Sequence, residues 1–411
     1  MGSDTSFDGE TERKEYKMRK VKILFCAGGT GGHIMPLLAV ADRIKESCST
    51  EAEIAFVMGN RAIDRSLAMN LPYSVVHLPL NKGIEGFSSA VKLAFKIFSS
   101  ISLSLFRLVA SCQAVVTSGS YVSLLPSICA FAMRRPVYLI EPNAYPGRFT
   151  RLLGKLCRRV FGGWHILKKY LGERNLDVVG IPLRKGFSNA PTKNEARRIL
   201  GIPQNSTVLF VLGGSQGAEA LNRFILENQR LIKYGVPNIY IIHIAGDKEC
   251  VKEIRQAYKE AGVASSVFDW WDDVWTLYAA SDVVLARSGA LTCAEIMKMK
   301  RPALIVPHPS CADQHQLLNA MEIGREGVAT VVEQKNLKDR GLGALITLLI
   351  NHDVRRKMEE AFEKTDSLTN AEKKIAEKIL REILEESRDG KVSQVVVNRC
   401  ARTAVFGCRA S

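Results

Sequence analysis

The sequence predicts an α/β protein made of two doubly wound, Rossmann-like domains that face a cleft. Short apolar, β-branched runs alternate with longer amphipathic segments, which is typical of a parallel sheet with crossover helices. The pattern starts again after residue 184, and each half opens with a strand, a glycine-rich turn and a helix. A chain of 411 residues also exceeds one ordinary core, so two domains are expected.

The apolar pattern places the elements in order. In the first half we predict strands over 21–25, 54–58, 75–78, 114–117 and 137–140, with a helix over 36–46 after the first strand. In the second half we predict strands over 207–212, 239–244, 283–286 and 303–306, with a helix over 218–233. The expected domains are 21–183 and 184–369. A helix over 370–387 is expected to return to the first domain. Residues 1–20 are expected to be a disordered extension and residues 388–411 a loose basic tail.

Composition narrows the class of protein. Hydrophobic residues make up 46% and charged residues 24%, as in a globular domain. The net charge of +15 favours an anionic membrane surface or a pyrophosphate substrate. No zinc-finger, RNP-like or helix-turn-helix pattern is present, so we expect no nucleic-acid partner.

Cysteines and apolar runs bear on the compartment. No C-x-x-C pair occurs, and the cysteines within apolar runs are predicted to be buried free thiols of a reducing cytoplasm. These are Cys26, Cys112, Cys129, Cys157 and Cys293. The polar residues 1–20 do not resemble a signal peptide. The uncharged stretch 108–133 is broken by polar residues, glycine and proline, so we predict a soluble or peripheral protein.

Two glycine-rich turns carry the first functional signal. Residues 27–33 read Ala-Gly-Gly-Thr-Gly-Gly-His and residues 212–218 read Leu-Gly-Gly-Ser-Gln-Gly-Ala. Glycines allow positive φ and let an anion approach bare N–H groups at a helix start. Ile34 stands where a dinucleotide fingerprint has its third glycine, and no acidic residue follows the second strand. A purely structural turn stays open for the first turn, but one in each half favours a donor in one domain and an acceptor in the other.

The ordered motifs identify a family. Gly28-Gly-Thr-Gly-Gly-His33, Gly213-Gly-Ser-Gln-Gly-Ala218, Arg287-Ser-Gly-Ala-Leu-Thr-x-x-Glu295 and Asp313-Gln-His-Gln316 occur in the order and spacing of the MurG family, which the chain resembles over 21–386. The resemblance implies the GT-B fold and an inverting transferase. It would move N-acetylglucosamine from UDP-GlcNAc to undecaprenyl-pyrophosphoryl-MurNAc-pentapeptide (lipid I), giving lipid II.

The same resemblance implies a cellular role. The reaction belongs to peptidoglycan synthesis, and so to cell-wall biogenesis, cell shape and cell division. It would take place peripherally at the cytoplasmic face of the bacterial inner membrane, with neither a cofactor nor a metal.

The resemblance also assigns site residues by position. Glu295 would bind the donor ribose, and Ser215, in one turn with Gln216, would lie at the pyrophosphate. Arg184 and the backbone of Trp271 would lie near the nucleotide, and Asn143 and Gln316 would hold sugar hydroxyls. The remaining assignments are amides at the phosphate and sugar (Ala290, Leu291, Thr292) and a lining for the reacting centre (Thr30, Gly31, Gly32).

The chemistry requires a base and help for the departing UDP. His33, at the end of a glycine turn, is the predicted base, with a backbone-bonded structural role as the alternative. Glu141 is the second candidate base. Amides and helix dipoles can take the leaving charge. No D-x-D motif stands in a suitable strand–loop setting, and Asp272-Asp273 is expected to be structural.

A basic amphipathic stretch over 83–109 is the candidate membrane face. Its apolar and basic residues (Phe87, Lys92, Phe95, Lys96, Phe98, Arg107) form a stripe suited to an interface, and an ordinary core helix stays open as the alternative.

Two other functions also stay open. Ile140-Glu-Pro-Asn143 differs from the family's usual His-Glu-Gln-Asn, which leaves room for another lipid acceptor of the diacylglycerol type. A UDP-GlcNAc 2-epimerase-like isomerase would have the same fold and need no acceptor.

Overall fold

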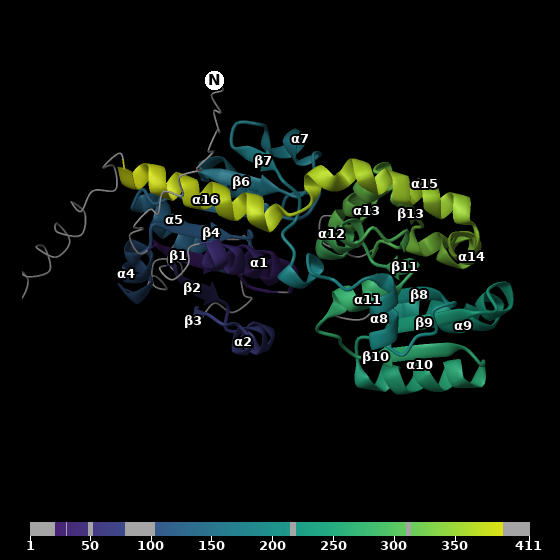
Figure 1. The fold of residues 1–411 in the computed structure, drawn as a ribbon. Helices are drawn as coiled ribbons and strands as arrows, with labels where there is room; N and C mark the ends of the chain where they lie inside the picture. The colour runs from purple at the N-terminus through teal and green to yellow at the C-terminus, as the bar shows by residue number, and fades with distance from the viewer. Residues whose placement is uncertain are drawn as a thin grey trace, which may run out of the picture.

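The chain forms two lobes, each built around its own parallel sheet (Figure 1). The structure is a computed structural model, and it describes residues 21–29, 31–47, 52–78, 103–213, 219–309 and 314–388. In Figure 1 the first lobe runs from purple to blue and the second from teal to green. Apolar strands are buried on both faces because crossover helices cover both sides of a parallel sheet.

The first sheet has seven strands in the order β3-β2-β1-β4-β5-β6-β7. Every neighbouring pair is parallel. The strands are β1 (Val21–Cys26), β2 (Ala52–Met58), β3 (Ser74–His77), β4 (Ala114–Thr117), β5 (Val137–Glu141), β6 (Arg159–Gly162) and β7 (Leu176–Val178). The helices are α1 (Gly31–Ser47), α2 (Ala62–Met69), α4 (Leu103–Ser111), α5 (Leu124–Ala132), α6 (Arg148–Leu153) and α7 (Leu167–Leu171), with short turns η1 (Tyr121–Ser123) and η2 (Gly154–Leu156).

The second sheet has six strands in the order β10-β9-β8-β11-β12-β13, again all parallel. The strands are β8 (Thr207–Leu212), β9 (Ile239–Ile244), β10 (Ala264–Phe268), β11 (Val283–Ala286), β12 (Ala303–Ile305) and β13 (Ala329–Val331). The helices are α8 (Lys193–Ile199), α9 (Glu219–Gly235), α10 (Lys248–Glu260), α11 (Val274–Ala280), α12 (Ala290–Met299), α13 (His315–Arg325), α14 (Leu342–Ile350) and α15 (His352–Phe362). Short turns are η3 (Lys185–Phe187), η5 (Gln334–Asn336), η6 (Leu337–Gly341) and η7 (Glu363–Leu368).

The last helix, α16 (Ala371–Arg388), leaves the second lobe and packs against α1 of the first (Figure 1). Its buried Glu382 accepts hydrogen bonds from Tyr138 (3.1 Å) and from Arg159 Nε (2.7 Å). Ile375 and Ile379 of α16 are fully buried in the core of the first lobe. The chain therefore crosses between the lobes twice.

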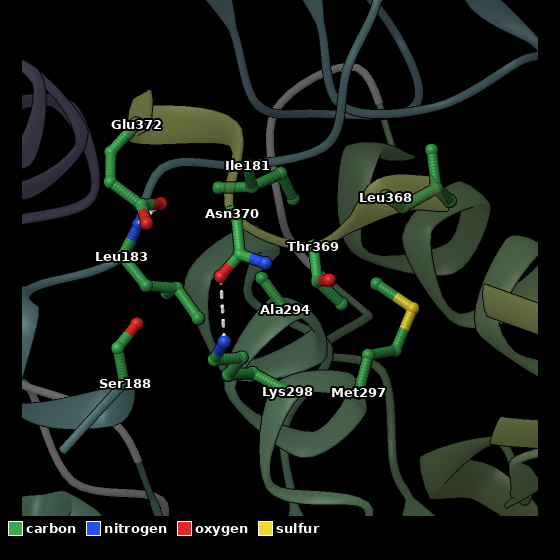
Figure 2. Close-up of a pocket in the computed structure, with 10 residues that line it drawn as sticks. All are labelled: Ile181, Leu183, Ser188, Ala294, Met297, Lys298, Leu368, Thr369, Asn370 and Glu372. Atoms are coloured by element: carbon green, nitrogen blue, oxygen red, sulfur yellow. Dashed lines mark hydrogen bonds between the residues drawn. The ribbon is translucent and has the colours of Figure 1, made fainter. Parts of the chain in front are cut away.

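The two crossings touch each other. Gly180 has φ +93°, and a Cβ there would lie 1.8 Å from the carbonyl oxygen of Leu368, so only glycine lets the two segments meet. Figure 2 shows the small cavity beside this contact, of about 10 Å³, and the 2.7 Å hydrogen bond from Lys298 Nζ to Asn370 Oδ1. One side of α12 thus packs against the connection between the lobes.

All the strands predicted from the sequence are confirmed, and so are the buried free thiols of the five cysteines. Four strands were missed (β6, β7, β10 and β13). Helix α1 begins at Gly31, before Pro36, so the predicted start was wrong by more than a turn. Pro36 has no N–H to donate to the carbonyl of Gly32. Because it lies close to the start of α1, this missing hydrogen bond does not stop the helix.

The second lobe holds a histidine that is completely buried. Neutral His243, on β9, pairs its two ring nitrogens with Tyr258 Oη (2.8 Å) and Asn222 Oδ1 (3.0 Å). The amide oxygen can only accept, so Nε2 carries the proton and Nδ1 accepts from the tyrosine hydroxyl. Burial lowers the pKa of His243 from 6.5 to about 3.

This histidine makes stability depend on pH. The unfolded chain binds the His243 proton at about pH 6.5 and the folded chain does not, so stability is full above that pH and falls as the pH drops toward 3. We expect the free energy of unfolding, measured with urea, to fall through His243 by up to about 1.4 kcal/mol for each pH unit in this window. His243→Gln should show a smaller loss between neutral and acid pH than the parent. Equal losses in the two proteins would exclude His243 as the source.

Candidate active site

A cleft of about 1070 Å³ lies between the lobes and is lined by both. The first lobe contributes the start of α1, part of α2 and the residues after β5, and the second contributes the loops that follow β8, β10, β11 and β12. These loops lie at the carboxyl ends of parallel strands, where ligands of open α/β sheets bind.

The first glycine turn is held from below by a buried carboxylate. Asp64 is fully buried and accepts from Gly29 N (2.7 Å) and from the Tyr121 hydroxyl (3.2 Å). Gly29 has φ +106°, and a Cβ on Gly28 would lie 2.4 Å from the side chain of Val122. Glycine is therefore required at both positions, by backbone conformation at one and by close packing at the other.

His33 follows this turn and lines the cleft. Its Nδ1 lies 3.1 Å from the carbonyl oxygen of Ser118, so in the neutral ring Nδ1 carries the proton and Nε2 keeps a lone pair. Burial lowers the pKa of His33 below 6.5 and outweighs Glu141 and the Ser118 bond, which raise it; His315, across the cleft, lowers it further. The ring is therefore neutral at physiological pH and can accept a proton.

Glu141 is not placed like a base. It is 3% exposed and does not line the cleft. Its carboxylate accepts from Thr150 Oγ1 (2.6 Å), from Gly147 N (3.0 Å) and from both nitrogens of Asn143 (3.1 and 3.3 Å). With its oxygens engaged in this way, Glu141 fixes the loop that presents Asn143, and the hypothesis that it is the base loses its geometric support.

Asn319 joins the lobes inside the cleft wall. It is fully buried; Oδ1 accepts from Ala144 N (2.7 Å), and Nδ2 donates to Ser288 O (3.1 Å) and Asn143 Oδ1 (3.3 Å). The side chain of Asn143 is thereby held between Glu141 on its own lobe and Asn319 on the other.

Glu295 lies on α12, on the second-lobe side of the cleft. Its Oε2 accepts from the Tyr278 hydroxyl (3.0 Å). Burial raises the pKa of Glu295 above 4.5, and Tyr278 and Arg184 counteract that rise. The N-cap residue of α12 is Gly289, which has no side chain to cap the helix, and Ala290, Leu291 and Thr292 of the first turn line the cleft at the positive end of the helix dipole.

The predicted site residues largely converge. Those that line the cleft are Gly31, Gly32, His33, Asn143, Arg184, Trp271, Ala290, Leu291, Thr292, Glu295 and Gln316. Thr30, Ser215 and Gln216 lie outside the described residues, and Glu141 lies behind the cleft wall. Other residues that line the cleft were not predicted from the sequence (Phe187, Trp270, Arg287, His308, Gln334). Of these, only Arg287 stood in a recognised motif.

The predicted membrane face is described only at its end. Phe87, Lys92, Phe95, Lys96 and Phe98 lie outside the described residues. Leu105, in the same 83–109 stretch, is 2% exposed and packs in the core, so its side of α4 is core packing. Phe106 and Arg107 are exposed on the other side of α4.

Two facing Rossmann-like lobes, with a helix start and a half-buried carboxylate on one wall of the cleft between them, have the architecture of the GT-B fold. Models of the glycosyltransferase family 28 N-terminal and C-terminal domains match residues 23–162 and 208–379. The chain belongs to this family, and within it resembles the MurG type.

Individual relatives agree with the family. A protein of Carboxydothermus hydrogenoformans is 30% identical over 83% of this chain and 92% of its own length, and one of Syntrophotalea carbinolica is 31% identical over 88% and 98%. Both are named UDP-N-acetylglucosamine–N-acetylmuramyl-(pentapeptide) pyrophosphoryl-undecaprenol N-acetylglucosamine transferase. The crystal structure of Acinetobacter baumannii MurG superposes with a TM-score of 0.68 at 22% identity, covering 88% of this chain and 99% of that one.

Proposed function

We propose that this chain transfers N-acetylglucosamine from UDP-GlcNAc to the MurNAc-pentapeptide of lipid I, with inversion, giving lipid II for peptidoglycan synthesis. The main support for the proposal is that one cleft is lined by His33 from the first lobe and by Glu295 from the second. The two relatives that are 30% and 31% identical, named for this reaction, support it.

The second lobe holds the donor. Ionised Glu295 accepts from the two ribose hydroxyls, while the N–H groups at the start of α12 and the guanidinium of Arg184 meet the diphosphate. Asn143 and Gln316 bind hydroxyls of the sugar, so the sugar lies where the two lobes meet.

The first lobe binds the acceptor and supplies the base. His33 Nε2 takes the proton of the acceptor hydroxyl while that oxygen bonds to the anomeric carbon from the side opposite UDP. The bond from the anomeric carbon to UDP breaks, and its electron pair leaves with the diphosphate, where the start of α12 and Arg184 stabilise the charge. The scheme uses no metal, and we expect activity to persist in EDTA.

The transfer experiment also separates the alternatives. The chain is incubated with labelled UDP-GlcNAc, with and without a polyprenyl-pyrophosphoryl muropeptide, and the products are separated. We expect a labelled lipid product only with the muropeptide. UDP-ManNAc formed without acceptor would favour a 2-epimerase, and transfer to diacylglycerol instead would replace the acceptor.

The base is tested by His33→Ala. We expect turnover at saturating acceptor to fall about 10²-fold or more, because general-base help is lost, while donor affinity stays near the parent value. His77 is the matched control: its Nδ1 also bonds a carbonyl (Gly59, 2.7 Å), but it does not line the cleft. His77→Ala should keep normal turnover. Normal turnover in His33→Ala would return His33 to a structural role.

The donor carboxylate is tested by pH. Burial raises the pKa of Glu295 above 4.5. UDP-GlcNAc affinity should therefore be full at neutral pH, and as the pH is lowered it should start to fall at a higher pH than the titration of an ordinary glutamate would give. The diphosphate of UDP-GlcNAc is esterified at both ends and does not titrate in this range. Glu295→Gln should bind about 1–3 kcal/mol more weakly at neutral pH and lose the acid dependence. Calorimetry that shows the same pH profile in both proteins would remove Glu295 from the donor site.

We also propose that the chain works on a membrane surface, at the cytoplasmic face of the bacterial inner membrane. None of the helices in the described part of the chain has the length and apolarity to cross a bilayer. The support is an exposed apolar and basic set on α4 (Leu103, Phe106, Arg107), together with a net charge of +15.

The membrane proposal predicts weaker vesicle binding when this set is altered. Phe106→Ser with Arg107→Glu should reduce sedimentation with anionic vesicles roughly 5- to 30-fold, since each basic contact contributes about 1 kcal/mol. Turnover of a short water-soluble acceptor should hardly change. Tyr234→Ser is the control, because Tyr234 is 88% exposed on α9 of the second lobe. Vesicle binding that survives the α4 changes, or falls equally in the control, would contradict this surface.

A further inference from the structure

Arg184 enters the cleft from the connection between the lobes and is half-buried. Its guanidinium lies over the ring of Trp275, 5.0 Å from the ring centroid. Within the described ranges, its side chain has no hydrogen-bond acceptor. A half-buried arginine fixed on an aromatic face, with its N–H donors unused, is suited to an anionic ligand.

Trp275, on α11, is itself held by the turn that follows Arg184. A Cβ on Gly186 would lie 2.3 Å from the indole, so glycine is needed for the backbone to lie on the ring. Phe187 packs edge-on against the indole, with centroids 5.7 Å apart at 71°. The arginine and its aromatic support are therefore fixed by one turn of chain.

The same aromatic row reaches the donor carboxylate. Phe187 packs against Tyr278 (6.2 Å between centroids), and the Tyr278 hydroxyl donates to Glu295 Oε2 (3.0 Å). Trp275, Phe187 and Tyr278 thus form a continuous row of packed rings. This row supports Arg184 at one end and Glu295 at the other, and both of these line the cleft.

We propose that Trp275 is a positioning residue that fixes Arg184 for the diphosphate of the nucleotide donor. The inference rests on the proposed function for the identity of the donor. A free arginine side chain loses much rotamer entropy when it binds an anion, and a stacked one has already lost it. Removing the ring should therefore weaken diphosphate binding without removing any ligand contact.

The test is calorimetry with UDP, and with uridine as the probe that lacks the diphosphate. Trp275→Leu should weaken UDP binding about 3- to 30-fold, the range of a cation–π contact, and leave uridine binding unchanged. Trp275→Phe keeps an aromatic face and should stay within about 3-fold of the parent. Tyr145→Leu is the control: it removes a ring that also lies 5.0 Å from an arginine, Arg151, and that does not line the cleft.

A double-mutant cycle separates positioning from packing. In an Arg184→Ala background, Trp275→Leu should cause no further loss of UDP affinity, because the side chain it positions is absent. An equal loss in both backgrounds, or a parallel loss of uridine affinity, would overturn the proposal. A parent that binds UDP yet fails to transfer N-acetylglucosamine would overturn the proposed function and leave the Trp275 comparison intact.

Discussion

The buried amide of Asn319 is the contact on which the cleft depends. An amide cut off from water needs hydrogen-bond partners for its oxygen and its nitrogen, and Asn319 finds them on the loop after β5 (Ala144 N, 2.7 Å) and on the loop after β11 (Ser288 O, 3.1 Å). These contacts hold the two lobes at one separation and bring Asn143 to the second lobe. The chain crossing at Gly180 and the return of α16 onto α1 leave the lobes joined on the side of the connection.

Burial acts on both key groups of the cleft, but it favours the working form of His33 alone. Burial disfavours the charged form of each, so His33 stays neutral and basic, while Glu295 needs help to stay ionised. That help comes from the Tyr278 hydroxyl and from the charge of Arg184, which Trp275 supports. The aromatic row beneath the cleft therefore helps to keep Glu295 ionised, in addition to its role in packing.

The sequence was sufficient for strands with apolar runs, because burial on both faces leaves a near-continuous apolar signal. It was insufficient for β7, which has three residues, and for β10, whose Ala-Ser-Ser start is polar. The motifs located most of the cleft, but Glu141 could not be placed, because its partners Gly147 and Thr150 are brought to it only by the folded loop. Trp275 carries no motif, and on α4 periodicity alone could not say which face meets the core.

We propose that the donor nucleotide binds on the second lobe and that the base acts from the first. A crystal structure of the chain with UDP-GlcNAc would place both groups at once. We expect the ribose hydroxyls within hydrogen-bond distance of Glu295, the diphosphate at the start of α12 beside Arg184, and the anomeric carbon open toward His33. A nucleotide whose diphosphate lies instead on the glycine turn after β1, away from α12, would overturn this assignment of the lobes.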